Sequence, residues 1–578
     1  MPPQSLILEG RTFLGRAWQL AKPYWRSDER RSAWLLLVSI ISLSLCIVYL
    51  LVVLNDWNRQ FFNAIEQKNK DDFYQLLIQF CSIALAYILV AAARAYLRQS
   101  LEMRWRIWLT RTYLGEWLDD QVYYRLEQNA RGTDNPDQRI ADDLRQFTSA
   151  SLALTLDLLQ QVVTLASFIV ILWTVSGALA FTIGGTDWTI PGYMVWVAVL
   201  YAIAGSIATF YVGRPLIGLN FRQERFEADF RFSLVRMREH AEGIALYRGE
   251  RAEHAHLQGN VEGIRSNWWR IMRANLKLNL LTNTYGQIAV VFPFFVAAPR
   301  YFAGTITFGT LTQIADAFGT VQSSLSWFVQ SYASLAGWKA SVDRLLTFHD
   351  AVKDAAGEAR DQPGVKRGDN EERTIEAVNL GLVLPNGRAL LADASFSIAP
   401  GARLLLRGLS GSGKSTVFRA IAGIWPYGSG TMKIPAGARV MFLPQKPYIP
   451  IGSLRAAVTY PSASSGFDDD AIKAALRSVQ LDGFADRLEE ARNWSLAMSG
   501  GEQQKLAIAR ALLAAPEWLF LDEATSSLDE PTETILYELL MTRLPRAAIV
   551  SIAHRSQVAA FHTATLQLSN GRLAGEAR

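Results

Sequence analysis

Long apolar runs fill the first part of the chain, and each is close to the length that a helix needs to cross a lipid bilayer. A helix rises about 1.5 Å per residue, so about 20 apolar residues span a hydrocarbon core of about 30 Å. Six runs qualify, which predicts a helical membrane domain. They lie at 33–54, 74–97, 151–181, 192–213, 279–299 and 309–332.

The charges beside the first run predict its orientation. Arg26, Arg30 and Arg31 precede it, which places the N-terminus in the cytoplasm, and six crossings return the chain to that side. The stretches 98–150 and 214–278 are charged and periodic at helical spacing, so we expect long helices that continue into the cytosol. We see no signal-peptide pattern before the first run.

The fifth and sixth runs carry polar residues at membrane depth. Such groups are tolerated where they face protein or a water-filled cavity. In one interpretation they join helices to each other. The whole set favours a hydrophilic passage, with Asp316 as a pathway candidate only. The polar residues are Asn279, Asn283, Gln287, Gln313, Asp316, Gln322, Ser323, Ser324, Ser326 and Gln330.

The remainder of the chain reads as a soluble α/β domain. Residues 350–373 have many charges and few large apolar side chains, which predicts a solvated linker between a membrane domain at 1–349 and a second domain at 374–578. The net charge is +5, but the cations cluster beside the apolar runs, so membrane topology explains it and no nucleic-acid partner is expected. Cys46 and Cys81 lie inside apolar runs and indicate neither a disulfide framework nor a metal site.

A glycine-rich loop follows the apolar stretch "ARLLLRG" and precedes a helical pattern. Gly408, Gly413, Lys414 and Ser415 fit G-x-x-x-x-G-K-[ST]. In that motif backbone N–H groups converge on phosphate oxygens, the lysine reaches the β and γ phosphates, and the hydroxyl holds Mg²⁺. The expected ATP-binding residues of this loop are Gly408, Ser410, Gly411, Ser412, Gly413, Lys414, Ser415 and Thr416.

Two further stretches fit phosphate chemistry. "EWLFLDEATSSLD" ends a strand in Asp522, suited to a magnesium contact, and Glu523, suited to orienting or deprotonating water. In isolation such a pair is more often a helix cap, but the upstream loop favours catalysis. "MSGGEQQ" opens a helix, so its N–H groups and the Ser499 hydroxyl can bind a second anion. A second phosphate site makes sense if it serves a neighbouring subunit's nucleotide.

These motifs and their order resemble the ABC transporter family. "GLSGSGKST" corresponds to Walker A, "FLPQKPY" with Gln445 to the Q-loop, "MSGGEQQ" to the signature, "LFLDE" to Walker B, "SSLD" with Asp529 to the D-loop, and "SIAHR" with His554 to the switch histidine. The resemblance implies an exporter-like type IV fold of six membrane helices plus an α/β P-loop domain. It also implies a twofold homodimer of half-transporters, with each ATP between one subunit's Walker A and the other's signature.

The resemblance also implies residue roles. The catalytic residues are expected to be Glu523, His554 and Gln445, and the Mg²⁺ ligands Ser415, Gln445 and Asp522. Further ATP contacts are expected from Gln445, Ser499, Gly500, Gly501, Glu502 and Asp529. Family members often stack adenine on an aromatic residue upstream of Walker A, where this chain has Leu384 and Pro385; Met498 replaces the usual leucine that opens the signature.

The membrane half narrows the resemblance. "LNDWNRQFFNAIEQKN", "NPDQRIADDLRQF" at 135–147 and "FEADFRFSLVRMREHAEGIALYRGERAE" at 226–253 resemble the SbmA/BacA-type membrane domain fused to an ABC ATPase, and peroxisomal and lysosomal half-transporters share similar stretches. Short helices at the cytoplasmic tips are expected to dock on the nucleotide domains near Gln445.

The resulting hypothesis is alternating-access transport in the bacterial inner membrane. We expect uptake of bulky hydrophilic solutes, with peptides first, cobalamin second, and fatty acyl-CoA or lipid third because the polar runs suit a hydrated cavity. A soluble ABC ATPase acting on DNA or ribosomes would explain the motifs but not the six runs. An ATP-gated channel would explain both halves.

Overall fold

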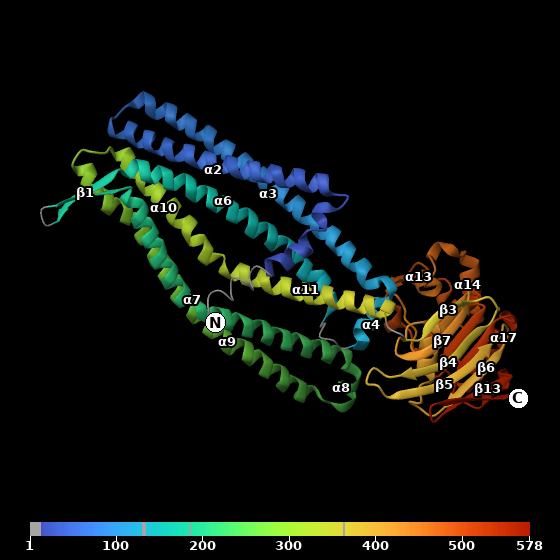
Figure 1. The fold of residues 1–578 in the computed structure, drawn as a ribbon. Coiled ribbons are helices and arrows are strands. Elements are labelled where there is room, and N and C mark those ends of the chain that lie inside the picture. Colours follow the sequence, from blue (N-terminus) through green and yellow to red (C-terminus); the bar gives the residue numbers. More distant parts are fainter. Residues whose placement is uncertain (1–12, 130–134, 184–185, 362–363, 578) are drawn as a thin grey trace. The chain divides into compact units, whose positions relative to one another are not determined.

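The computed structural model describes residues 13–129, 135–183, 186–361 and 364–577 (Figure 1). The chain divides into two compact units. The first contains Met1–Gly115 and Thr133–Asp350, and the second contains Glu116–Gly132 and Ala351–Arg578. The stretch before residue 13, on which the absence of a signal peptide was judged, lies outside the described residues.

Long helices build the first unit, as the apolar runs predict (Figure 1). Among the described residues, five helical segments are long and apolar enough to cross a membrane. The sixth predicted span is also a helix, α10, but its polar residues keep it out of that set. The long helices are α2 (Arg30–Glu66), α3 (Lys70–Leu118), α6 (Leu144–Ser176), α7 (Tyr193–Glu239), α9 (Glu250–Phe302), α10 (Phe308–Gln330) and α11 (Tyr332–Asp361).

Shorter elements connect these helices. They are η1 (Tyr24–Arg26), α5 (Pro136–Gln138), the π-helical η3 (Arg139–Asp143), α8 (Ala241–Tyr247), and the antiparallel strands β1 (Ala178–Ile183) and β2 (Thr186–Pro191). The two strands form a hairpin between α6 and α7, so the helix that the third apolar run predicts as far as 181 ends at Ser176 instead. The charged stretches continue α3, α7 and α9, which confirms that these helices extend well past their apolar runs, but short elements interrupt the stretches at 119–129, 135–143 and 240–249.

The C-terminal part of α2 fixes the start of α10. Asn63 Oδ1 accepts a hydrogen bond from the Gly309 N–H at 3.0 Å, and Glu66 Oε2 accepts one from the Phe308 N–H at 3.0 Å. Gly309 packs so closely that a Cβ there would lie 2.0 Å from the Arg59 carbonyl oxygen. Two N–H groups that the helix cannot satisfy internally therefore bond to α2, and this contact sets the position of the polar helix α10.

Two sheets form most of the second unit. A six-stranded sheet has the order β14-β13-β6-β12-β11-β8, parallel except for the β13–β14 pair, and a four-stranded sheet has the order β3-β7-β4-β5. Their strands are β3 (Lys366–Asn370), β4 (Ile375–Val383), β5 (Ala389–Ile398), β6 (Arg403–Gly408), β7 (Gly428–Pro435), β8 (Val440–Leu443), β11 (Trp518–Asp522), β12 (Ala548–Ile552), β13 (Ala564–Ser569) and β14 (Arg572–Ala577).

Helices and a small strand pair complete the second unit. They are η2 (Asp119–Gln121), α4 (Val122–Asn129), α12 (Lys414–Ala422), β9 (Gly452–Ser453), α13 (Leu454–Thr459), η4 (Ser464–Gly466), α14 (Asp469–Ser478), η5 (Asp482–Phe484), β10 (Ala491–Arg492), α15 (Trp494–Ala497), α16 (Gly500–Ala514), α17 (Glu530–Arg543) and η6 (Gln557–Phe561).

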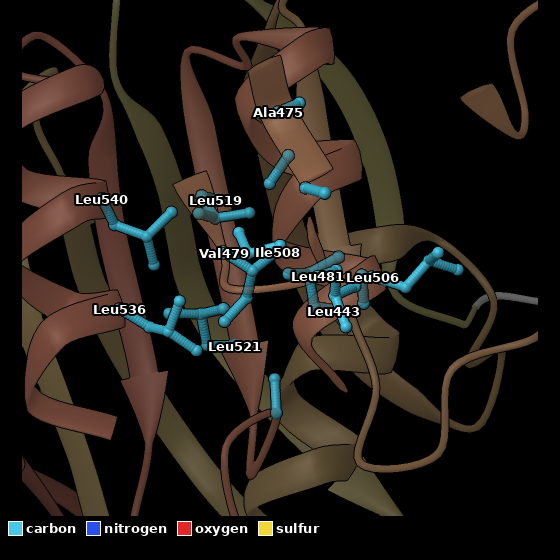
Figure 2. Packing of buried hydrophobic residues seen from close by; sticks show 14 of the residues in the cluster. Leu443, Ala475, Val479, Leu481, Leu506, Ile508, Leu519, Leu521, Leu536 and Leu540 are labelled. Carbon is cyan, nitrogen blue, oxygen red and sulfur yellow. The ribbon is translucent and has the colours of Figure 1, made fainter. Parts of the chain in front are cut away.

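The strand β11, between β12 and β8, is buried on both faces. Leu519 and Leu521 belong to a core with α14, α16 and α17, in which Figure 2 labels Leu506, Ile508 and Leu536. Trp518 and Phe520 belong to the core on the other face, with β4, β5 and α12. Alternate side chains of a strand point to opposite faces, so a continuous apolar run here means burial on both sides. This packing fixes the end of β11, where Asp522 and Glu523 lie.

The boundary between the units differs from the predicted linker. In the described part of 350–373, α11 continues to Asp361 and β3 pairs with β7. The tip helix α4 belongs to the second unit, where Arg125 Nη1 donates to the Ala355 carbonyl at 3.4 Å. Beside α4, Gln121 lines a cavity of about 780 Å³ together with Arg367 and Phe442. Ala355 lies in α11, Arg367 lies in β3, and Phe442 lies in β8 close to Gln445, where the sequence placed the docking; that docking stays a prediction.

Candidate nucleotide site

The loop between β6 and α12 has the backbone of a phosphate-binding loop. Gly413 has φ 102°, a left-handed value that disfavours any residue with a Cβ. At Gly408 a Cβ would lie 2.5 Å from the Leu568 carbonyl oxygen, so the strand needs glycine there for close packing. Lys414 begins α12 and is 7% exposed, and its Nζ donates to the Gly408 and Leu409 carbonyls at 2.9 and 3.0 Å.

The same loop fits a triphosphate. The first N–H groups of a helix have no partner inside the helix and bind anions, and the start of α12 presents them beside the buried Lys414 ammonium. Ser412 Oγ is buried and has no hydrogen-bond partner among the described residues. A phosphate oxygen would satisfy this hydroxyl. The predicted loop residues are therefore assembled as phosphate binding requires.

Ser415 and Asp522 meet at the start of α12 and the end of β11. Ser415 Oγ donates to Asp522 Oδ1 at 3.0 Å. Burial and, to a smaller extent, the Glu523 carboxylate raise the pKa of Asp522 above its usual value, against the effect of the Ser415 hydrogen bond. Hydroxyl and carboxylate oxygens are the ligands that Mg²⁺ prefers. This pair fits a magnesium ion beside the phosphates.

The three predicted catalytic residues meet at Glu523, which contacts both Gln445 and His554. One carboxylate oxygen accepts a hydrogen bond from Gln445 Nε2 at 3.1 Å, and the other lies 3.0 Å from His554 Nε2. Its backbone has φ 50°, which a side chain with a Cβ adopts only at a cost of about 1–2 kcal/mol, and its N–H bonds the Ile552 carbonyl at 3.0 Å. Strained residues of this kind cluster at functional sites. The strain and both side-chain contacts hold the Glu523 carboxylate in one orientation.

The signature glycines pack against the D-loop of the same chain. Gly500 and Gly501 open α16, and a Cβ on Gly501 would lie 3.2 Å from Leu528 Cδ2. Ser499 caps the helix: its Oγ donates to Glu502 Oε2 at 2.8 Å and accepts from the Glu502 N–H at 3.3 Å. Among the described residues no hydrogen bond joins residues 499–502 to the Walker A loop. The signature and Walker A of one chain therefore do not form a single site by direct contact.

Asp529 precedes α17 as its N-cap residue, and its side chain makes no capping hydrogen bond. Leu384 and Pro385, at the position of the family's adenine-stacking residue, lie at a turn in which the Leu384 N–H bonds the Arg388 carbonyl at 2.8 Å. Neither residue offers an aromatic ring to a base.

The structure adds Gln504, which was not among the predicted site residues. It is 2% exposed, and its Nε2 donates to the Gln445 carbonyl at 3.1 Å and to Ser526 Oγ at 3.2 Å, while its Oε1 accepts from the Ser527 N–H at 2.9 Å. Gln504 thus links the Q-loop, the signature helix and the D-loop. The only sequence signal is its place in "SGGEQQ", because burial of an amide cannot be read from a motif.

Comparisons with known proteins agree with this geometry. Residues 20–302 match the family model "ABC transporter transmembrane region 2", and residues 391–526 match the model "ABC transporter". The chain is 35% identical to the inner membrane ABC transporter ATP-binding protein YddA of Escherichia coli, over 93% of this chain and 94% of the relative. It is 31% identical to the chloroplastic ABC transporter D family member 2 of Arabidopsis thaliana, over 97% and 87%.

Two more distant similarities extend the comparison. The human lysosomal cobalamin transporter ABCD4 is 25% identical over 97% of this chain and 95% of its own length. A bacterial Atm1-family ABC exporter solved with ATP bound superposes with a TM-score of 0.72 at 18% identity, over 95% of both chains. This second similarity shows a shared exporter fold, which confirms the predicted fold class. The finer resemblance to the SbmA/BacA type stays a prediction.

The motifs, the assembled nucleotide site, the exporter fold and the full-length similarity to YddA agree. The chain belongs to the ABC transporter family and is a multi-pass half-transporter, with a membrane domain fused to an ABC ATPase that binds ATP with Mg²⁺ and couples its hydrolysis to transport.

Proposed function

We propose that two copies of this chain form an ATP-driven importer of bulky hydrophilic solutes in the bacterial inner membrane. The observation that carries the proposal is the division of the nucleotide site within one chain. Walker A and Walker B meet through Ser415 and Asp522, whereas the hydrogen bonds of Ser499 among the described residues all stay within its own segment. A second copy would supply the missing signature. Closure of two such composite sites on ATP would then pull the two membrane domains into a new arrangement.

Within each site the residues divide the work. Lys414 and the N-terminus of α12 bind the phosphates, while Ser415 and Asp522 would hold Mg²⁺, which would neutralise phosphate charge. Glu523, held by Gln445 and His554, accepts a proton from the attacking water or orients it in line with the γ phosphate. Hydrolysis removes the anion that joins the two copies, and the dimer reopens.

A hydrophilic cargo is supported by the membrane helices. Asn279, Asn283 and Gln287 recur every four residues on one face of α9, and all three are exposed. In contrast Gln313 is 5% exposed, and its Nε2 donates to Asn55 Oδ1 at 3.1 Å. This residue therefore joins α10 to α2, which fits the interpretation that polar side chains link the membrane helices. Asp316 is exposed and accepts from Asn55 Nδ2 at 2.5 Å. We propose that the exposed amides line the solute path; Asp316 stays a candidate for it.

Peptides are our first choice of cargo and cobalamin the second, the latter because ABCD4 is named for cobalamin transport. Fatty acyl-CoA or another lipid ranks third, since an apolar chain gains nothing from the amide stripe on α9.

The test is uptake of labelled peptide, labelled cobalamin and labelled acyl-CoA into cells or vesicles. Glu523→Gln should abolish accumulation while the protein folds and binds ATP. Glu538→Gln is the matched control, because Glu538 is exposed on α17 away from the site. Accumulation by Glu523→Gln at the wild-type rate would refute ATP-driven import of that cargo. Solute that only equilibrates across the membrane with Glu523→Gln and ATP would show an ATP-gated channel instead.

A further inference from the structure

An apolar cavity of about 330 Å³ lies in the first unit, at the opposite end of the sequence from the nucleotide chemistry. Its walls come from the helical residues 13–21 and from η1, α2, α3, α6 and α11. Five of the chain's 17 tryptophans line it, and we call it the Trp cavity. These are Trp18, Trp25, Trp34, Trp105 and Trp338.

Ring contacts hold the walls of the Trp cavity in place. The Trp25 ring lies 5.4 Å from that of Trp34 and 5.9 Å from that of Trp105, centroid to centroid. Trp338 Nε1 donates to Ser151 Oγ, also in the wall, at 2.8 Å. Trp18 and Trp34 are 54% and 51% exposed, so the cavity reaches the protein surface. A preformed apolar slot of this kind accepts a hydrocarbon chain without rearranging.

The wall also contains an unused hydrogen-bond donor. Trp105 is 2% exposed, and its Nε1–H has no partner among the described residues. Buried indole N–H groups usually find an acceptor, and leaving one unpaired is unfavourable. A ligand that carries an ester carbonyl beside its hydrocarbon chain would supply that acceptor.

Cations neighbour three of the tryptophans that line the Trp cavity. Lys22 follows Trp18 by one helical turn, and Arg30 precedes Trp34 by one turn on the same face of α2. Arg104, next to Trp105, donates from Nη1 to Ser32 Oγ at 3.0 Å, which brings a cation of α3 to the start of α2.

The charge of this segment is positive overall. Residues 22–31 contain four cations and two carboxylates, and Arg104 on α3 adds a fifth cation. None of the five cations forms an ion pair within the described part of the chain. The cations are Lys22, Arg26, Arg30, Arg31 and Arg104, and the carboxylates are Asp28 and Glu29. Tryptophan and basic residues together mark the cytoplasmic interface of a bilayer, where anionic headgroups lie.

We propose that the Trp cavity binds an anionic phospholipid from the surrounding membrane. Its acyl chain lies among the indoles, an ester carbonyl accepts from Trp105 Nε1, and its phosphate lies at Lys22 and Arg30. Trp338 stands on α11, the helix whose C-terminal end enters the second unit, so the bound lipid braces the segment through which the two halves of the chain are joined. ATPase activity then depends on anionic lipid. The inference does not depend on which solute is transported.

The first test is native mass spectrometry of the full-length dimer after purification from vesicles of phosphatidylcholine with phosphatidylglycerol. We expect retained phosphatidylglycerol at about one molecule per chain. Arg30→Gln should lower its affinity roughly fivefold, since a cation near an anionic headgroup contributes about 1 kcal/mol. Arg222→Gln is the matched control, because Arg222 is exposed on α7 with no ion pair among the described residues. Equal retention of both lipids, or equal effects of the two substitutions, would overturn the proposal.

The second test uses the unaltered protein, so it holds even if a variant fails to fold. Phosphatidylglycerol with brominated acyl chains should quench tryptophan fluorescence more strongly than brominated phosphatidylcholine. Unlabelled phosphatidylglycerol should reverse the excess quenching, whereas inorganic phosphate should not. Reversal by acyl-CoA alone would mean that the cavity belongs to a cargo instead. Trp105→Phe removes the N–H together with part of the indole, and should weaken phosphatidylglycerol binding several-fold while leaving phosphatidylcholine retention unchanged.

Discussion

Asp143 is the residue whose replacement should damage the first unit most clearly. Its side chain is 3% exposed and accepts hydrogen bonds from Arg344 Nε at 2.9 Å and from Arg139 Nη1 at 2.8 Å. Burial alone would raise the pKa of Asp143, but the two arginines outweigh it and hold the pKa below its usual value. The carboxylate is therefore charged at neutral pH, and its stabilising contribution is lost only as the pH falls through that lowered pKa.

The cost of Asp143→Ala follows from this burial. Breaking a fully buried ion pair costs about 3–5 kcal/mol, because one charge loses its partner without regaining water. Here the side chain of Arg344 is 40% exposed and that of Arg139 is 15% exposed. Water therefore reaches the stranded cations, and we expect a loss of about 2–3 kcal/mol in the free energy of unfolding. Thermal unfolding of the purified protein should show a melting temperature several degrees lower.

The neighbouring Asp142 is a matched control. It pairs with Arg145 at 3.1 Å, but these side chains are 58% and 60% exposed. Exposed pairs contribute about 0–1 kcal/mol, so Asp142→Ala should leave the melting temperature almost unchanged. The double variant Asp143→Ala with Arg344→Met should recover part of the loss, because it removes a cation together with its counter-charge. Equal melting temperatures for Asp143→Ala and Asp142→Ala would refute this reasoning.

Three further changes test the nucleotide site. Gln504→Ala removes the hydrogen-bond partner of the Gln445 carbonyl and of the Ser527 N–H, both at partly buried contacts, which should cost about 1–2 kcal/mol and lower ATPase activity more than nucleotide binding. An unchanged ratio of ATPase activity to nucleotide binding would contradict a linking role. Because the pKa of Asp522 is raised, protons compete with Mg²⁺ for this carboxylate at a higher pH than for an ordinary aspartate. The Mg²⁺ concentration that gives half-maximal ATPase activity should therefore rise on mild acidification. In Asp522→Asn this Mg²⁺ concentration should no longer depend on pH. Gly413→Ala forces a Cβ into φ 102° and should abolish ATP binding measured by fluorescent-nucleotide titration, and retained binding would contradict the steric argument.

The elements that repeat a simple pattern could be predicted from the sequence. Apolar runs of spanning length became α2, α3, α6, α7 and α9, and the helical periodicity of the charged stretches predicted that these helices continue beyond the apolar runs. The nucleotide site was predictable for a different reason: each motif residue sits at the end of a buried strand or the start of a helix, and parallel strands bring such ends together. Hydrogen-bond distances accordingly separate Ser415 from Asp522. The same holds for Glu523 with Gln445 and for Glu523 with His554.

Other features depend on contacts that no local pattern encodes. The charged stretch before Asp361 looks like a linker, yet it continues the helix α11, because charged residues are equally at home on an exposed helix face. Gln504 and Gln313 are amides whose roles depend on burial between elements distant in sequence. The same limit applies to Asn63 and Glu66. Their stretch, "LNDWNRQFFNAIEQKN", carries a family resemblance, but only the fold shows that these two side chains bond the start of α10.

The central claim is that each ATP is held by residues from both copies of the chain, and mixing two inactive variants tests it most directly. Lys414→Ala disables Walker A, and Ser499→Arg disables the signature, so dimers of either variant alone should hydrolyse no ATP. A mixed dimer has one site with both elements intact if the sites are shared between copies, and none if each site lies within one chain. We predict that ATPase activity returns in co-purified mixed dimers. Mixed dimers that stay as inactive as the parent variants would contradict the account.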